Sequence, residues 1–153
     1  IYGAGHVGRA LVKIIEHTDF DIHWIDIDEK RFPEGSTSTF SKVIALDPAL
    51  IASHAPSNAY HVIITHSHPL DEAICFALLS KDQFRFCGLI GSKTKNSRFR
   101  SRLSKMGIKD EQIKKLTCPI GIDEINSKQP VKVAISIAAQ LSIWQETNGI
   151  RIG

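Results

Sequence analysis

A glycine-rich turn near the start of the chain, Gly3-Ala4-Gly5-His6-Val7-Gly8, limits what the chain can fold into more than any other feature. Residues 1–2 before it predict the end of a strand, and residues 6–17 repeat apolar positions at helical spacing. In such a strand–turn–helix unit, Gly3 permits the tight turn, Gly5 lets an anion approach the backbone, and Gly8 lets helix and strand pack closely. The turn therefore predicts the first unit of a sheet with an anion site at its edge.

The rest of the chain alternates strand and helix patterns. Strands are expected at 20–27, 42–46, 59–65 and 84–91, and helices at 48–55, 69–81, 94–106, 109–116 and 130–146. We expect the last helix to be largely buried, residues 117–122 to form a loop, and the polar stretch 32–41 to join the second strand to the third. The alternation predicts an α/β fold, a Rossmann-like doubly wound parallel sheet with helices on both faces. Its length of 153 residues fits one domain spanning 1–153.

Composition narrows the functional class. A net charge of +3 suits an anionic small molecule and gives no support for nucleic-acid binding without a basic motif. The three cysteines form no CxxC pair, so we expect neither a disulfide framework nor a structural zinc site, and we expect a reducing, cytoplasmic setting. No apolar run approaches the length of about 18 residues that suggests a membrane span.

Asp26, with Asp28 nearby, stands at the end of the second predicted strand. In dinucleotide-binding sites a carboxylate at this place accepts hydrogen bonds from a ribose, so Asp26 and the glycine turn together predict a nucleotide ligand. The alternative is a turn of the same shape that binds no dinucleotide, because a fold alone does not define a function.

Thr65, His66 and His68 follow the predicted buried strand 59–65, at the edge where open α/β sheets bind ligands. The two histidines could share a metal, for which Asp71 is the local candidate for a further ligand, or one of them could act as an acid or a base. In the alternative interpretation, one histidine caps the next helix and the other is solvated.

A basic segment follows the predicted strand 84–91. Small residues at a strand–helix junction followed by cations are typical of a phosphate site, here Gly91, Ser92, Lys93, Lys95 and Arg98. The spacing is not that of a P-loop. We expect Arg100 and Arg102 to be solvated, and the alternative is a basic surface helix without a ligand.

Cys118 precedes a proline in a predicted loop, so we expect its thiol to be more exposed than a core cysteine, with Lys114 and Lys115 favouring the thiolate. Cys75 and Cys87 lie in apolar patterns and are expected to be inert. An unreactive loop thiol is the alternative for Cys118. In a doubly wound sheet, we expect the glycine turn, the histidines and the Gly91–Lys93 junction to line one crevice that fits a large phosphorylated ligand.

Five stretches occur in the order GAGHVG, THSHPLDEA, GLIGSKTKNSRFRSRL, LTCPIG and VAISIAAQL. Together they resemble the C-terminal Rossmann domain of the xanthine dehydrogenase accessory protein family (XdhC/CoxI) over nearly the whole chain. The resemblance implies a maturation factor that binds the molybdenum cofactor, as molybdopterin or its cytosine dinucleotide form, and assists its sulfuration or insertion into a molybdoenzyme. It implies a cofactor-binding chaperone rather than a stand-alone enzyme, and a smaller N-terminal domain before residue 1.

The resemblance also assigns residues and partners. It places the cofactor site on Gly3, Gly5, His6, Gly8, His66, His68, Gly91, Ser92, Lys93 and Lys95, and makes Cys118 a thiolate ligand or sulfur carrier. The implied partners are an apo molybdenum hydroxylase of the xanthine dehydrogenase type and a cysteine desulfurase. Two further hypotheses stay open: an NAD(P)-dependent oxidoreductase, indicated by the glycine turn with Asp26, and a nucleotide-sensing regulatory module. Helix 130–146 could form a homodimer seam, although burial in the core is the commoner role of such a helix.

Overall fold

The computed structural model of the chain describes residues 1–35 and 38–148. It contains the parallel strands β1 (His23–Asp26), β2 (Ser41–Ile44), β3 (Tyr60–Ile63), β4 (Phe86–Leu89) and β5 (Leu116–Thr117). Tyr2 forms parallel bridges to Ile25 of β1 and to Ile63 of β3, and so joins the pair β2–β1 to the triplet β3–β4–β5. With Tyr2 counted as the first strand, the spatial order is 3-2-1-4-5-6, the Rossmann order that the alternation predicted.

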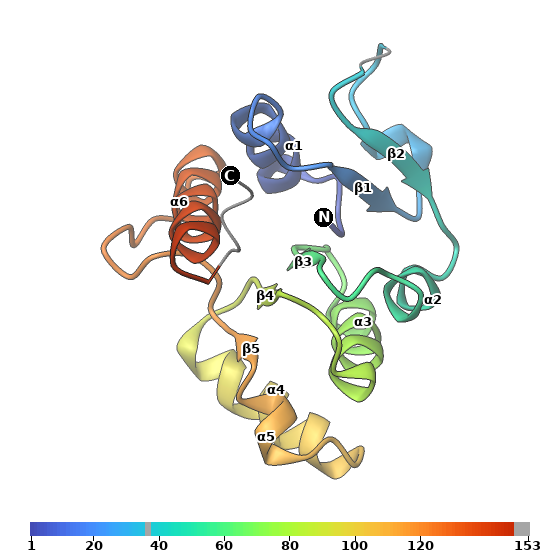
Figure 1. Cartoon of the computed structure of the whole chain (residues 1–153), viewed down its shortest axis with the longest axis vertical. Coiled ribbons are helices and arrows are strands. Elements are labelled where there is room, and N and C mark those ends of the chain that lie inside the picture. The colour runs from blue at the N-terminus through green and yellow to red at the C-terminus, as the bar shows by residue number, and fades with distance from the viewer. Residues whose placement is uncertain (36–37, 149–153) are drawn as a thin grey trace.

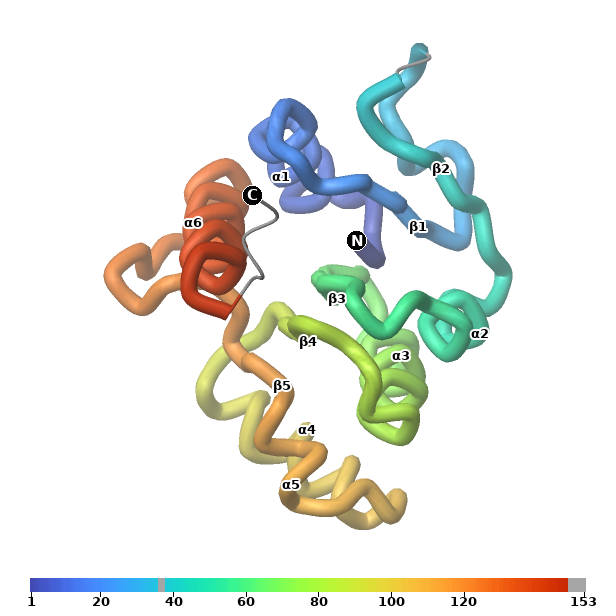
Figure 2. The backbone as a smooth tube through the Cα atoms, in the orientation of Figure 1, coloured from blue at the N-terminus to red at the C-terminus, as the bar shows by residue number. Residues whose placement is uncertain are grey.

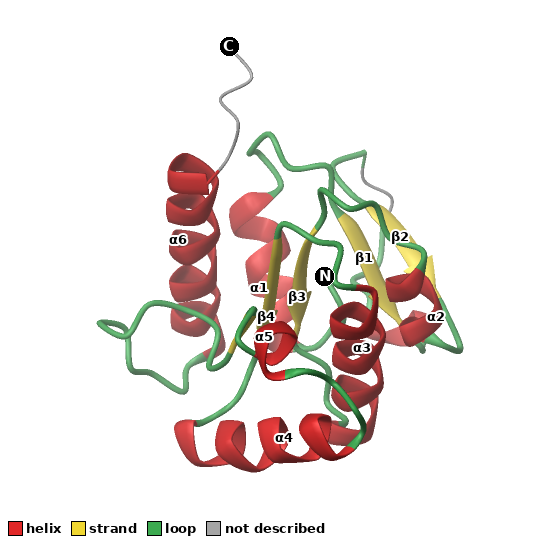
Figure 3. Ribbon diagram, turned by 60° about the horizontal axis from the view of Figure 1, so that its bottom comes forward, coloured by secondary structure: helices red, strands yellow, loops and turns green. Residues whose placement is uncertain are grey.

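Helices cover both faces of this sheet (Figures 1 and 3). They are α1 (His6–Ile15), α2 (Pro48–Ser53), α3 (His68–Lys81), α4 (Lys93–Lys105), α5 (Asp110–Ile113) and α6 (Pro130–Asn148), with a short 3-10 turn at Glu29–Arg31. The backbone tube of Figure 2 shows α1 beside α6 on one side of the strands and α2 beside α3 on the other. The prediction of helices on both faces is confirmed.

Two hydrophobic cores lie on opposite faces because neighbouring residues of a strand point in opposite directions. Trp24, Val62 and Phe86 pack with α1 and α6, whereas Ile25, Ile63 and Cys87 pack with α3 and α4. The central strands β3 and β4 are short and almost fully buried, as in other parallel sheets, whereas the edge strand β2 is largely exposed.

Three helices begin where a polar side chain accepts a hydrogen bond from the first turn. Asp47, Ser67 and Ser92 cap α2, α3 and α4 by accepting from the backbone N–H of Leu50, Leu70 and Lys95. Helix α4 ends before Gly107, whose φ of 95° is readily adopted by glycine alone. These local signals explain why the starts of α2, α3 and α4 lie within a residue of the predicted ones.

Two predicted elements are wrong in part. Residues 109–116 do not form one helix, since α5 covers only Asp110–Ile113 and Leu116–Thr117 is β5, which pairs with Cys87 and Gly88 of β4. Helix α6 is not largely buried, since Val131, Ile135 and Ile143 on its outer face are exposed. The 32–41 connection does join the second strand to the third, with residues 36–37 outside the described part.

Candidate functional site

The three glycines of the turn have different surroundings. Gly3 has a φ of 114° and lies against the Ile64 backbone, and a Cβ at Gly8 would collide with the carbonyl oxygen of Gly3. Gly5 has an ordinary extended backbone, and a Cβ there would meet none of the described atoms within 4 Å. Gly3 and Gly8 are therefore needed by the fold, whereas Gly5 leaves open space beside the first turn of α1.

The amino end of α1 is open to an anion. Its N-cap is Gly5, and no side chain among the described residues caps it, unlike α2, α3 and α4. His6, the first residue of the helix, is exposed. Uncapped N–H groups and the positive end of the helix dipole attract phosphate or carboxylate groups.

The buried carboxylate of Asp26 stabilises the glycine turn by accepting backbone hydrogen bonds. It accepts hydrogen bonds from the backbone N–H of Ala4 at 2.7 Å, of Ile27 at 2.7 Å and of Asp28 at 3.2 Å, and Arg31 lies 3.6 Å away. The side chain is 4% exposed. Asp26 therefore orients the glycine turn, and its expected contact with a ribose stays a prediction.

The glycine turn and the end of β3 line a narrow recess, too small for a water molecule, at the point where the strand order reverses. Its lining includes Gly3, Asp26, Thr65 and His66. His68 is the first residue of α3 and does not belong to the lining. Neither histidine caps the helix, because Ser67 does so, and the described residues contain no group of three or more His, Cys, Asp or Glu side chains that could hold a metal ion.

Asp71 of α3 is buried and contacts Thr65, one of the lining residues of the recess. It accepts hydrogen bonds from the Thr65 hydroxyl at 2.6 Å and from the Thr65 backbone N–H at 3.3 Å. Burial raises the pKa of Asp71 to about 6, although Thr65 and the two histidines act in the other direction. A carboxyl group that titrates near neutral pH at a ligand-binding edge is a candidate acid or base, which the sequence indicated only as a metal ligand.

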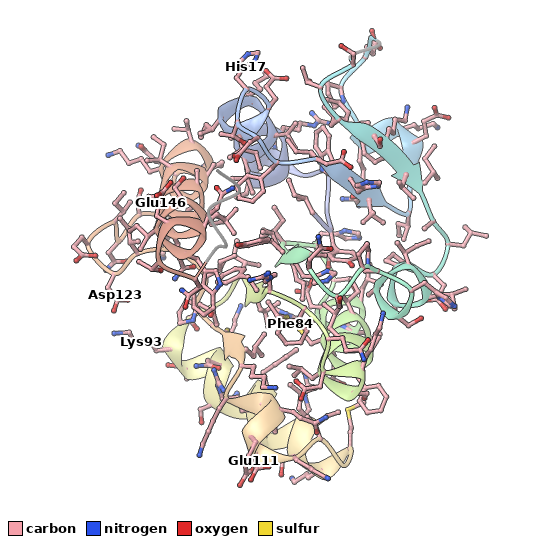
Figure 4. All side chains as sticks on the ribbon, in the orientation of Figure 1. His17, Phe84, Lys93, Glu111, Asp123 and Glu146 are labelled. Atoms are coloured by element: carbon pink, nitrogen blue, oxygen red, sulfur yellow. The ribbon has the colours of Figure 1, made fainter. Side chains whose placement is uncertain are left out.

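The ends of β4 and β5 form a second hollow, a groove of about 680 Å³ that includes Lys93, Cys118 and Asp123 in its lining. Lys93 and Asp123 are labelled at this side of the molecule in Figure 4. Gly91 lies against the Cys118 thiol, so the strand–helix junction and the Cys-Pro loop are neighbours. The expected single crevice is thus divided into two hollows, with Lys93 in the groove and the glycine turn and His66 in the recess.

Cys118 is more exposed than the buried Cys75 and Cys87, as expected, but the expected preference for the thiolate is wrong. The thiol is half-buried, and burial raises its pKa to about 11, with Arg100 acting in the other direction and Asp71 raising it further. Lys115, expected to favour the thiolate, binds Asp82 instead. Cys75 and Cys87 are buried, and the pKa of Cys75 is raised well above that of a free thiol, as expected of core cysteines.

Arg100 is not solvated, contrary to expectation. Its guanidinium donates to the carbonyl oxygens of Ile113 at 2.7 Å and Leu116 at 2.6 Å, and to the Asn96 side chain at 2.7 Å. Asn96 donates in turn to the Cys118 carbonyl oxygen at 2.7 Å. Helix α4 thereby fixes the chain that leads into the Cys-Pro loop.

Helix α6 fixes the other end of the loop. The Gln140 side chain accepts from the Gly121 N–H at 2.8 Å and donates to the Gly121 carbonyl oxygen at 3.0 Å. The Ser136 hydroxyl bonds the N–H and the carbonyl oxygen of Ile122 in the same way. No local signal in the sequence indicates these contacts, because each joins residues far apart in the chain.

These features define the class of protein. It is a Rossmann domain with an uncapped glycine turn, suited to an anion, where the strand order reverses, and with a separate groove whose lining includes the thiol of Cys118. The model of the XdhC Rossmann domain matches residues 1–141, and the chain belongs to this family. The family that the resemblance indicated is therefore confirmed. The ligand contacts that the resemblance assigned to individual residues stay predictions.

Proteins to which the chain is similar include a curated protein and a solved structure. The chain is 26% identical over 146 residues to the uncharacterized protein YqeB of Escherichia coli strain K12. That match covers 92% of this chain and 26% of YqeB. A crystal structure described as a xanthine dehydrogenase (BH1974) from Bacillus halodurans superposes with a TM-score of 0.80 at 25% identity. That match covers 99% of this chain and 43% of the other, so the chain spans less than half the length of either relative. No helix in the described part of the chain is long and apolar enough to cross a membrane.

Proposed function

We propose that this domain binds the molybdenum cofactor and assists its sulfuration or its insertion into a hydroxylase of the xanthine dehydrogenase type. The proposal is supported by membership of the XdhC family and by the likeness to a structure described as a xanthine dehydrogenase. The site observation that carries it is the uncapped amino end of α1, which faces open space at the switch point of the sheet.

The residues present fit the phosphorylated part of this ligand. The free N–H groups of α1 and the open surface of Gly5 suit a phosphate or diphosphate, and Lys93 supplies a positive charge at the neighbouring groove. When bound, the cofactor supplies a metal held by its own dithiolene. The free N–H groups of α1 and Lys93 would hold its phosphorylated part.

Cys118 is the thiol of this chain that reaches the groove. Its raised pKa keeps it protonated in the free chain, so a role as sulfur carrier or soft ligand requires the proton to leave when the ligand arrives. We propose that the sulfur-containing end of the cofactor binds in the groove, because the Cys118 thiol in its lining is a soft group that suits a soft ligand.

The test uses molybdenum cofactor released from a donor molybdoenzyme, mixed with the purified chain and separated by gel filtration. We expect pterin fluorescence and molybdenum in the protein fractions of the wild-type chain, and their loss from Gly5→Asp, which places a carboxylate where the anion lies. Ser57→Asp is the matched control, since it adds the same charge at an exposed position before β3, at the opposite edge of the sheet. Absence of pterin from the wild-type fractions, or equal binding by Gly5→Asp, would contradict the proposal.

The nicotinamide hypothesis is tested by the same chain. NAD and NADP are titrated separately and followed by calorimetry. Saturable binding of either at micromolar concentration would favour an oxidoreductase or a nucleotide sensor over a molybdenum-cofactor chaperone. Because the Asp26 carboxylate already accepts three backbone hydrogen bonds, we expect no such binding.

A further inference from the structure

The outer face of α6 carries an apolar ridge that nothing in the described chain covers. Val131, Ile135 and Ile143 are 53%, 46% and 55% exposed, and Ala139 between them is half-buried. These four residues are spaced four apart, so they lie along one ridge of the helix. Figure 1 shows α6 at the border of the molecule, with its inner side toward α1 and β4.

The ridge differs from what a surface helix normally presents. The opposite face of α6 already supplies the core through Ala134, Ile137 and Leu141, which are buried. Helix α4 has one buried stripe as well, but its exposed face is basic, with Arg98 and Arg102. Exposed apolar residues in a row on a helix mark a contact surface.

Charged residues flank the ridge symmetrically about Ala139. Lys132 lies seven residues before it, and Glu146, labelled on α6 in Figure 4, lies seven residues after it; both are exposed. If two α6 helices cross antiparallel on a two-fold axis at Ala139, Lys132 of each copy stands at the level of Glu146 of the other. The same operation places Ile135 of each copy against Ile143 of the other.

We propose that α6 is a homodimer seam, in which two copies of this chain pair antiparallel about a two-fold axis at Ala139. The small side chain of Ala139 allows close approach of the helix axes, and rows of residues four apart interlock in the commonest class of helix packing. An interface of this kind is self-complementary, as a two-fold dimer requires. A partner without a cation and an anion at matching positions would lack both ion pairs.

The dimer would bring the two candidate sites together. Gln140 follows Ala139 and holds Gly121 of the Cys-Pro loop from the inner side of the same helix. The two grooves would therefore lie on either side of the axis. The inference is independent of the identity of the ligand, so a failed cofactor test leaves it standing.

The first experiment measures the mass of the 153-residue chain by sedimentation equilibrium over about 1–500 µM, a range that covers weak to moderate dimers. We expect twice the 17.0 kDa of one chain at the upper end. Ile135→Glu puts a charge against the apolar Ile143 of the other copy, one helical turn from the axis, and should weaken association at least about tenfold. Leu46→Glu is the matched control, since Leu46 is 95% exposed on the far side of the sheet and should leave the dimer intact.

The second experiment tests the register. Lys132→Glu and Glu146→Lys each replace two attractive pairs by two repulsive ones and should weaken the dimer. The double variant Lys132→Glu/Glu146→Lys restores opposite charges across the axis and should recover association within about threefold of wild type. Because all these side chains are exposed, thermal unfolding of each variant should match wild type and confirms that the fold is kept.

Three outcomes would overturn the seam. A wild-type chain that stays monomeric throughout the range would show that the ridge binds a different protein or none. A dimer that survives Ile135→Glu would place the interface elsewhere. Failure of the double charge swap to recover association, when both single reversals weaken it, would exclude the antiparallel register.

Discussion

Gly5 has an ordinary backbone and an open surface, and these two properties allow a side chain to be added without strain. Gly5→Asp should stabilise the fold by a few tenths of a kcal/mol, because aspartate is a better N-cap than glycine and its charge complements the helix dipole. Urea unfolding at pH 7.5 measures this gain. A variant that is more stable and yet loses the ligand would separate an anion site from a structural turn, whereas a destabilised variant would show that Gly5 serves the fold.

The raised pKa of the Asp71 carboxyl group should make the free energy of unfolding depend on pH. Its pKa is raised from 3.8 to about 6, so the folded state holds a proton that the unfolded state has lost between these values. The sign follows: Asp71 favours the folded state below pH 3.8, and this contribution is lost as the pH rises through about 6. At pH 7.5 the wild-type chain should therefore be less stable than Asp71→Asn by about 2 kcal/mol, and the difference should shrink toward pH 4.

The measurement is a series of urea unfolding curves of both proteins from pH 4 to 7.5. Another buried group, His61, has its pKa lowered to about 3 by burial, so its contribution falls as the pH drops below 6.5. This opposite trend is present in both proteins and cancels in their difference. A difference that does not depend on pH would show that the pKa of Asp71 is the same in the folded and unfolded states.

At the scale of the element, α4 stabilises the Cys-Pro loop through Arg100. Arg100→Ala removes hydrogen bonds to the carbonyl oxygens of Ile113 and Leu116 and should lower the free energy of unfolding by about 2–3 kcal/mol. Arg102→Ala, two residues along the same helix, removes the ion pair with Glu72, in which Arg102 is 57% and Glu72 22% exposed, and should cost less than Arg100→Ala, about 1 kcal/mol.

The same pair of variants has a second readout. Arg100→Ala should also expose the Cys118 thiol, which would then react faster with an added disulfide reagent, while the buried Cys75 and Cys87 stay unreactive. Equal stability and equal thiol reactivity of the two arginine variants would show that the contacts of Arg100 do not hold the loop.

Elements with strong local signals could be predicted from the sequence, and those set by distant partners could not. Ser67 and Ser92 mark the starts of α3 and α4 within a few residues of the apolar pattern. In contrast, Leu116 and Thr117 follow a run of helix-forming residues and become a strand because they pair with Cys87 and Gly88. The local sequence pattern cannot predict this pairing, because the partner strand is far away in the chain.

The candidate site divides in the same way. The glycine turn, the end of β3 and the Gly91–Lys93 junction were predictable because parallel strands end at one edge. The protonated state of Cys118 and the internal role of Arg100 depend on burial and on carbonyl groups 13 and 16 residues away, which sequence spacing does not reveal.

At the scale of the whole molecule, the continuity of the sheet depends on the short segment that joins its two halves. In the described part of the chain, the short segment around Tyr2 joins β1 to β3, through backbone hydrogen bonds such as Tyr2 N–H to the Val62 carbonyl and Ile25 N–H to the Ile1 carbonyl, both 2.8 Å. The turn that follows it packs against Gly8 of α1. Damage at this point therefore affects both halves of the sheet and both hydrophobic cores at once.

Gly8→Ala tests this dependence. The added Cβ would meet the carbonyl oxygen of Gly3, a backbone atom that cannot rotate away, so α1 or the central strand must shift. We expect a loss of about 3 kcal/mol in the free energy of unfolding, in one cooperative transition seen equally by the fluorescence of Trp24 and Trp144 and by circular dichroism. Gly5→Ala, in the same turn but with open space around it, is the matched control and should change stability by less than about 0.5 kcal/mol. Two separate transitions in Gly8→Ala would show instead that the two halves of the sheet fold independently of the strand that joins them.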